Sequence, residues 1–159
     1  MTLTPPLDDA VLATLVKGLA DAVVVADAEG TICFWNAAAE RVFGWSAEQA
    51  VGSSLDLIIP ERQRGRHWDG YRTVMATGET KYGSDLLRVP SLHADGQRHS
   101  IAFTVTLLTG DDGAVTGIAA VVRDETERWS DEQELRRRLR ASEQAADPEA
   151  QPPADARAG

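Results

Sequence analysis

The stretch PERQRGRHWDGYRTVM, residues 60–75, is the segment around which the rest of the sequence is organised. Proline suits the first turn of a helix, because the N–H that it lacks would have no partner there. The sequence therefore predicts a helix that begins near this proline. On that helix His67, Tyr71, Val74 and Met75 fall at i, i+4, i+7 and i+8, so their side chains share one face. The imidazole is expected to point inward with the apolar side chains.

Basic side chains gather on the same segment, although the protein as a whole is acidic. Its net charge is -9 and its pI is about 4.7. Such a charge repels phosphate backbones, so general nucleic-acid binding is not expected. Four arginines nevertheless lie close to the histidine: Arg62, Arg64, Arg66 and Arg72. This cationic patch is local and needs a local explanation.

The composition is that of one globular domain with some extra sequence. Of the 159 residues, 43% are hydrophobic and 26% are charged, and a domain of this size needs neither metal nor disulfide to fold. The single cysteine, Cys33, makes no intrachain bridge and fits a reducing compartment. We expect Cys33 to lie on a strand and its small side chain to fill space in the hydrophobic core. Without a leader or an apolar run of the ~20 residues that span a bilayer, the chain is expected to be cytoplasmic and to have no membrane contact.

The first half of the chain predicts a helix, a hairpin and several short helices. Asp8 or Asp9 can cap a helix with one apolar side, formed by Leu12, Leu15, Val16 and Leu19. Two β-rich runs, 22–27 and 31–35, are separated by Ala28-Glu29-Gly30, whose glycine permits a tight turn. Further signals mark two short helices: Asn36 as an N-cap with Gly44 as a stop, then Ser46 and Gln49 as a capping box.

The second half changes to the period of two that is typical of strands. Strands are predicted at 81–92, 98–109 and 115–123, with Ile101, Phe103, Val105 and Leu107 on one face of the second. A final helix, with Asp124 as its cap and Glu127 at N3, continues to about Gln144. The expected organisation is a lead with an amphipathic helix (1–20), a sensor domain (21–123), a signalling helix (124–144) and a disordered tail (145–159).

This order of elements resembles the PAS sensor domain, and local motifs strengthen the resemblance. They are the run from Asp27 to Glu40, the run GWSAEQAVG at 44–52, and Arg123-Asp124-Glu125-Thr126-Glu127, which matches the D-x-T signature before an output helix. The resemblance implies an α+β fold with a five-stranded antiparallel sheet in the order 2-1-5-4-3. Helices would cover one face and leave a ligand cavity between the sheet and the long helix.

Within that family, IIPERQRGRH at 58–67 resembles the haem-binding PAS domains of bacterial oxygen-sensing kinases and phosphodiesterases. The resemblance implies haem b as cofactor and His67 as the proximal iron ligand. It also implies a sensor for a diatomic gas (CO, NO or O2) or for redox state. This chain has Leu87 where the oxygen sensors place a distal arginine, and Thr73 at a position that can hold a propionate-binding arginine. Oxygen selectivity is therefore not implied.

A haem group makes demands that this sequence can meet. Neutral imidazole is a good iron ligand. The guanidinium groups of arginine suit the two carboxylates of haem, because they can donate two parallel hydrogen bonds. An apolar distal pocket without a strong hydrogen-bond donor would favour CO or NO. The expected cofactor-binding residues are Arg64, Arg66, Tyr71, Arg72, Val74, Met75, Leu87, Ile101, Phe103 and Val105. By itself, a lone histidine on an apolar helix face is more often a core or cavity residue, so a haem-free PAS module that mediates dimerisation or binds another small ligand stays open as the alternative.

The remaining features concern output. No phosphate-binding glycine loop, nucleophile elbow or metal-spaced histidine pair is present, so no enzymatic activity is expected. The final helix has a thin apolar stripe, Trp129, Leu135 and Leu139, among dense charges. Such a stripe is typical of a short coiled coil, which needs a partner helix. We therefore expect a homodimer formed through this helix, acting on an effector protein.

Overall fold

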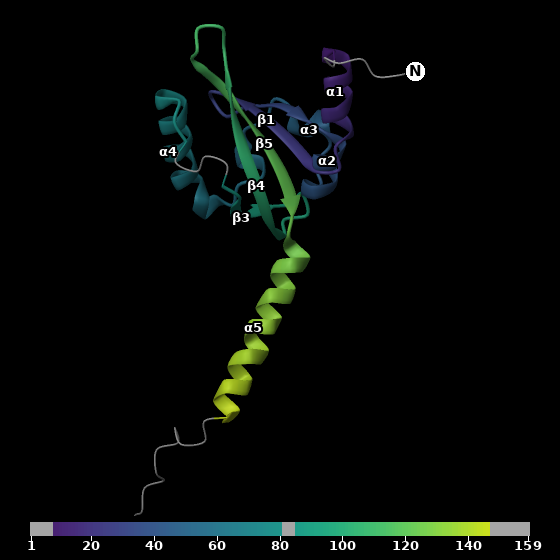
Figure 1. Ribbon diagram of the computed structural model, residues 1–159, viewed down its shortest axis with the longest axis vertical. Helices are drawn as coiled ribbons and strands as arrows, with labels where there is room; N and C mark the ends of the chain where they lie inside the picture. The colour runs from purple at the N-terminus through teal and green to yellow at the C-terminus, as the bar shows by residue number, and fades with distance from the viewer. Residues whose placement is uncertain (1–7, 81–84, 147–159) are drawn as a thin grey trace, which may run out of the picture. The chain divides into compact units, whose positions relative to one another are not determined.

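A computed structural model describes residues 8–80 and 85–146. Its elements, in chain order, are α1 (Asp9–Gly18), β1 (Ala22–Asp27), β2 (Ile32–Trp35), α2 (Ala37–Phe43), α3 (Ala47–Ala50), η1 (Leu55–Leu57), α4 (Glu61–Thr77), β3 (Leu87–Leu92), β4 (Arg98–Thr109), β5 (Val115–Asp124) and α5 (Thr126–Ala146) (Figure 1). The chain divides into two compact units, Met1–Glu125 and Thr126–Gly159.

The five strands form one antiparallel sheet in the order β2-β1-β5-β4-β3. This confirms the fold class and the strand order that the family resemblance implied. The chain first makes the β1–β2 hairpin, then leaves the sheet for its helices and returns with β3, β4 and β5. Figure 1 shows α4 alongside the β4–β5 hairpin, so the predicted histidine helix lies beside the sheet.

The hydrophobic core lies between α2, α3 and one face of the sheet. Phe43 is fully buried and packs with Trp35, the two ring centroids being 5.1 Å apart. The same cluster contains Val24, Ile101 and Val122, one from each of β1, β4 and β5. Because β-strand side chains alternate between faces, the strands contribute every second residue to this core.

Local capping signals in the sequence are confirmed. Asp8 caps α1, Asn36 caps α2, and the α2 helix ends at Gly44 in the left-handed conformation, with φ 76°. Ser46 and Gln49 form both hydrogen bonds of the capping box at the start of α3. These signals are reliable because a side chain three residues from a free N–H forms the bond without help from the rest of the fold.

The helix predicted to begin near Pro60 is confirmed, with Pro60 as the N-cap of α4. The predicted cap of the last helix was wrong, because Asp124 is the last residue of β5, where it pairs with Ile101. The predicted first helix is present as α1, which contains no buried residue and in which Leu15 is 56% exposed. Strand pairing, which the local pattern does not show, thus kept Asp124 outside α5.

The ends of two predicted elements fall partly outside the described residues. The strand expected over 81–92 is observed as Leu87–Leu92, and residues 81–84 lie outside the described part. α5 extends to Ala146, two residues beyond the predicted end, and the tail from residue 147 lies outside the described part. No helix among the described residues is long and apolar enough to cross a membrane.

Candidate functional site

The inner face of α4 has the composition that its sequence predicted. Tyr71 is buried, and His67, Val74 and Met75 are half-buried, whereas Arg62, Arg66 and Arg72 are exposed. The helix has an apolar face because its apolar residues recur every three to four positions. His67 therefore lies on the side of α4 that is withdrawn from water.

Three rings form a cluster on α4. The centroid of the His67 ring is 4.9 Å from that of Trp68 and 5.6 Å from that of Tyr71, and the Trp68 and Tyr71 centroids are 5.5 Å apart. Such tilted and edge-on geometries are favourable between aromatic rings. Trp68 was not predicted as part of the site, because it follows His67 directly and such neighbours do not share a helix face in the sequence pattern.

Polar contacts attach this cluster to the preceding turn. Trp68 Nε1 donates to Asp56 Oδ1 at 2.9 Å, and Arg64 donates from Nη2 to the Asp56 carbonyl and from Nε to the Ile59 carbonyl. The Tyr71 hydroxyl donates to the backbone carbonyl of Asp27 at the β1–β2 turn. α4 is therefore anchored to η1 at one point and to the hairpin at another, which orients the histidine.

The hairpin turn fits closely under Trp68. A Cβ atom at Gly30 would lie 2.3 Å from two carbons of the Trp68 ring, and Gly30 has φ 82°. Only glycine meets both requirements, because it has no Cβ and tolerates positive φ. The glycine that the sequence indicated as a turn former is thus also the place where the indole packs.

Burial controls the protonation of His67. Withdrawal from water lowers the pKa of its imidazole, because the charged form loses hydration, and the carboxylate of Asp56 opposes this effect in part. Its Nδ1 atom is buried and has no hydrogen-bond partner in the described part of the chain. The lowered pKa favours the neutral imidazole, which is the form that ligates metals.

The sheet presents the apolar residues that were predicted to face His67. Leu87 pairs directly with Phe103 across β3 and β4, so the two side chains share a face with Ile101 and Val105. Ile101 is buried, and the other three are half-buried. The structure therefore confirms the shared face that alternation predicted for Ile101, Phe103 and Val105, and the strand register adds Leu87 to it.

The arginines differ in how they are engaged. Arg64 is occupied by its two backbone acceptors and lies 3.6 Å from Asp56 Oδ1. Arg72 pairs with Asp69 at 2.5 Å, with both side chains exposed. Since exposed ion pairs are weak, Arg72 and the exposed Arg66 stay accessible to an anion, whereas Arg64 mainly serves to hold the turn before α4.

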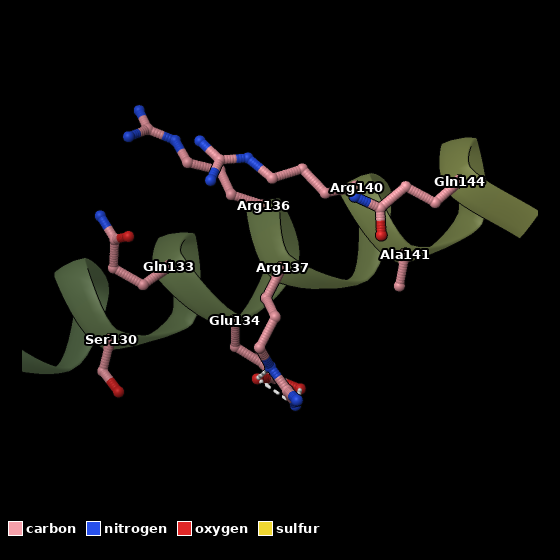
Figure 2. A pocket seen from close by; sticks show the side chains of 8 residues that line it. All are labelled: Ser130, Gln133, Glu134, Arg136, Arg137, Arg140, Ala141 and Gln144. Atoms are coloured by element: carbon pink, nitrogen blue, oxygen red, sulfur yellow. Dashed lines mark hydrogen bonds and ion pairs between the residues drawn. The ribbon is translucent and has the colours of Figure 1, made fainter. Parts of the chain in front are cut away.

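A surface hollow of about 420 Å³ lies next to the ring cluster, lined by Ala28, Glu29, Trp68, Tyr71 and Arg72. It includes two of the predicted ligand-binding residues and does not include His67. A second hollow runs along α5 and is lined by residues of that helix alone, all of them polar or charged except Ala141 (Figure 2). In Figure 2 Arg137 turns toward Glu134, to which it donates two hydrogen bonds.

Two other histidines form a pair that sequence reasoning missed. The rings of His93 and His99 are stacked, with centroids 4.6 Å apart. His93 Nδ1 lies 2.9 Å from Asp95 Oδ1, and His99 Nδ1 lies 3.6 Å from Asp124 Oδ2. Their positions at the two ends of the β3–β4 turn are the signal that would have paired them. No group of three or more metal-ligating side chains occurs among the described residues.

The expectation for Cys33 was wrong. Its side chain is exposed, although it lies on β2 as predicted. The hairpin places every second residue of this edge strand toward solvent.

A Tyr71→Phe variant is expected to have a free energy of unfolding about 1 kcal/mol lower, because it loses the hydrogen bond from the Tyr71 hydroxyl to the Asp27 carbonyl, which then keeps only the Gly30 N–H as donor. Burial, reinforced by nearby acidic groups, raises the pKa of Tyr71 to about 12. Between pH 10 and 12 the unfolded chain therefore releases this proton while the folded chain keeps it, and stability falls as pH rises. Urea unfolding from pH 8 to 12 should show a steeper decline for the wild type than for the variant. Parallel curves would contradict a buried Tyr71 hydroxyl.

The PAS fold model matches residues 11–124, and the chain belongs to the PAS family. It is a PAS sensor domain of the kind used in signal transduction.

Comparisons with individual proteins agree with this assignment. The chain is 36% identical over 118 residues to an uncharacterized protein of Azorhizobium caulinodans, with 74% of this chain and 16% of that protein covered. It is 30% identical over 118 residues to the sensor protein FixL of Bradyrhizobium diazoefficiens, with 73% and 23% covered. The chain therefore spans less than a quarter of the length of these relatives. The PAS domain structure from Colwellia psychrerythraea superposes with a TM-score of 0.65 at 24% identity, covering 74% of this chain and 97% of that one.

Proposed function

We propose that this PAS domain binds haem b through His67 and senses a diatomic gas or the redox state of the iron. The observation that supports this most is a half-buried imidazole on the inner face of α4 whose pKa is lowered by burial, which favours the neutral form that ligates metals. The similarity to the sensor protein FixL supports a role as a sensor. Bound haem would supply an iron centre able to take up CO, NO or O2.

The residues present fit such a group. Leu87, Phe103 and Val105 offer an apolar surface of half-buried side chains, and Arg66 and Arg72 offer exposed cations for the two carboxylates. Arg64, which is held by the turn before α4, is the least suited of the three arginines. None of the apolar residues donates a hydrogen bond, so we propose that CO or NO is preferred over O2.

A haem titration of the purified chain, followed by absorption spectroscopy, tests this proposal. A Soret band that saturates at one haem per chain is expected, together with shifts on reduction and on addition of CO. A titration without a saturable band, with haem remaining extractable by albumin, would contradict the proposal.

The alternative is a haem-free PAS module that binds a smaller ligand. The hollow beside Trp68 favours it, because about 420 Å³ is a volume typical of sites for small organic molecules. Glu29 and Arg72 at its margin would orient a polar ligand. Under this alternative the haem titration gives no saturable Soret band, whereas small molecules that bind in the hollow raise the melting temperature of the protein.

We further propose that the chain forms a homodimer through α5 and acts on an effector protein. Trp129, Leu135 and Leu139 are 53%, 68% and 59% exposed, and Leu135 and Leu139, four residues apart, lie on the same face of α5. With Leu135 at d and Leu139 at a of a heptad, a second parallel copy would bury both leucines.

We also propose a cytoplasmic location, because a chain with a single cysteine fits a reducing compartment.

Charges beside the leucines support this parallel pairing. The same heptad places Asp131 at g and Arg136 at e, and the g residue of one helix meets the e residue five positions later on its partner. Arg138 and Glu143 repeat the arrangement one heptad further on. Both interhelical pairs are attractive. In the single chain Arg136 pairs with Glu132 and Arg138 pairs with Glu134. On association, each arginine would exchange this partner on its own helix for a carboxylate on the second helix.

Charge reversal tests the dimer. Asp131→Arg is expected to raise the dimer dissociation constant about tenfold, because an attractive pair becomes a repulsive one at two symmetric places. Adding Arg136→Asp to the same chain should restore the wild-type value, as measured by sedimentation equilibrium. Equal dissociation constants for the single variant and the wild type would contradict this register.

A further inference from the structure

Two buried polar atoms on the inner face of α4 have no hydrogen-bond partner within the described residues. They are the side-chain oxygen Oε1 of Gln63 and the ring nitrogen Nδ1 of His67. Leaving a buried polar atom unpaired costs free energy, so each of these two atoms calls for a partner. Gln63 and His67 are four residues apart on one helix, which is the spacing at which side chains meet.

The two atoms are chemically complementary. An amide oxygen only accepts hydrogen bonds, whereas Nδ1 of a neutral imidazole donates when it bears the ring proton. Other polar groups around the histidine are already engaged. The Asp56 carboxylate accepts from Trp68 and lies beside Arg64, and the Tyr71 hydroxyl donates to the Asp27 carbonyl.

We propose that Gln63 is a positioning residue for His67, its Oε1 accepting a hydrogen bond from Nδ1–H and thereby leaving the lone pair on Nε2. A rotamer change of one or both side chains forms this bond. The consequence for ligand binding rests on the proposed haem function, because a fixed Nε2 lone pair is what an axial ligand needs. The hydrogen bond itself is a property of the protein without haem.

Nitrogen-15 NMR of the haem-free chain measures the tautomer directly. In the wild type, above the pH at which His67 titrates, Nδ1 is expected to be protonated and Nε2 unprotonated. In Gln63→Leu, which keeps a similar side-chain volume without the acceptor, the population should shift toward the Nε2–H form. Gln63→Glu retains an acceptor at this position and should restore the wild-type tautomer. Gln133→Leu, a control at an exposed position on α5, should leave His67 unchanged.

Haem binding provides an independent second measurement. Gln63→Leu is expected to weaken haem binding about tenfold and to lower the iron–histidine stretching frequency in resonance Raman spectra of the reduced protein, since loss of an outer partner of a ligand typically costs 10–100-fold. Gln63→Glu should raise that frequency. An unchanged His67 tautomer in Gln63→Leu would overturn the role of Gln63, even if haem binds. A wild type that binds no haem would overturn the proposed function and leave the tautomer result valid.

Discussion

A His67→Ala variant is expected to lose the Soret band of a histidine-ligated haem, with haem affinity at least about tenfold weaker than in the wild type. The reason is that alanine offers no lone pair to the iron, and losing even an outer partner of a ligand costs that much. Alanine also opens space on the inner face of α4. Free imidazole added to the variant is therefore expected to enter that space and to restore the band in part.

His93→Ala is the matched control for this variant. His93 is also a histidine in partial contact with solvent, but it stacks on His99 at the β3–β4 turn, apart from the inner face of α4. It should leave the Soret band in place. If His67→Ala keeps the wild-type spectrum, or His93→Ala loses it, another residue is the axial ligand. Circular dichroism of the haem-free variants shows that any loss of the band comes from ligation and not from unfolding.

Asn36→Ala is expected to lower the free energy of unfolding by about 3 kcal/mol or more. Asn36 is 3% exposed, and its side chain makes four hydrogen bonds. Its Oδ1 accepts from the backbone N–H groups of Val23 and Ala39, each at 2.9 Å. Its Nδ2 donates to the carbonyls of Val16 and Asp21 at 3.3 and 3.1 Å. One side chain thus joins α1, the start of β1 and the N-terminus of α2, and alanine would leave backbone groups without partners.

Ser46→Ala provides the comparison for this variant. Ser46 is also an N-cap, but it is exposed and belongs to the short helix α3. Its loss is expected to cost about 1 kcal/mol, the usual value for an exposed cap. Urea unfolding of both variants measures the difference, which amounts to a large part of the 5–15 kcal/mol by which domains are stable. The role of Asn36 as a junction would be disproved if both variants unfolded at the same urea concentration.

Asn36 also shows how far local reasoning extends. The sequence predicted it as a helix cap, because asparagine before a run of alanines is a reliable signal. That signal says nothing of Val23 or Val16, which reach the same side chain only when β1 and α1 come together. The cap was local information, and the buried junction was not.

The candidate site divides in the same way. The spacing of His67, Tyr71, Val74 and Met75 predicted the inner face of α4, and strand alternation predicted the shared face of Ile101, Phe103 and Val105. The packing of Trp68 over Gly30 was not predictable, because indole and glycine are far apart in the chain. The exposure of Cys33 was missed for a related reason, since the pattern of a short edge strand does not say which face is covered.

The sequence by itself determined most of the elements, the caps of α1, α2 and α3, and the family, because periodicity and capping depend on residues a few positions apart. The strand order followed from the family resemblance. Only the tertiary structure decided which polar atoms are satisfied. It engaged Arg64 with the turn before α4, joined Trp68 to Asp56, and stacked His93 on His99. Within the described part of the chain, it also left one buried polar atom of Gln63 and one of His67 unpaired. Burial and hydrogen-bond partners arise from segments distant in the chain, so the protonation and the chemical role of His67 depend on the fold as a whole.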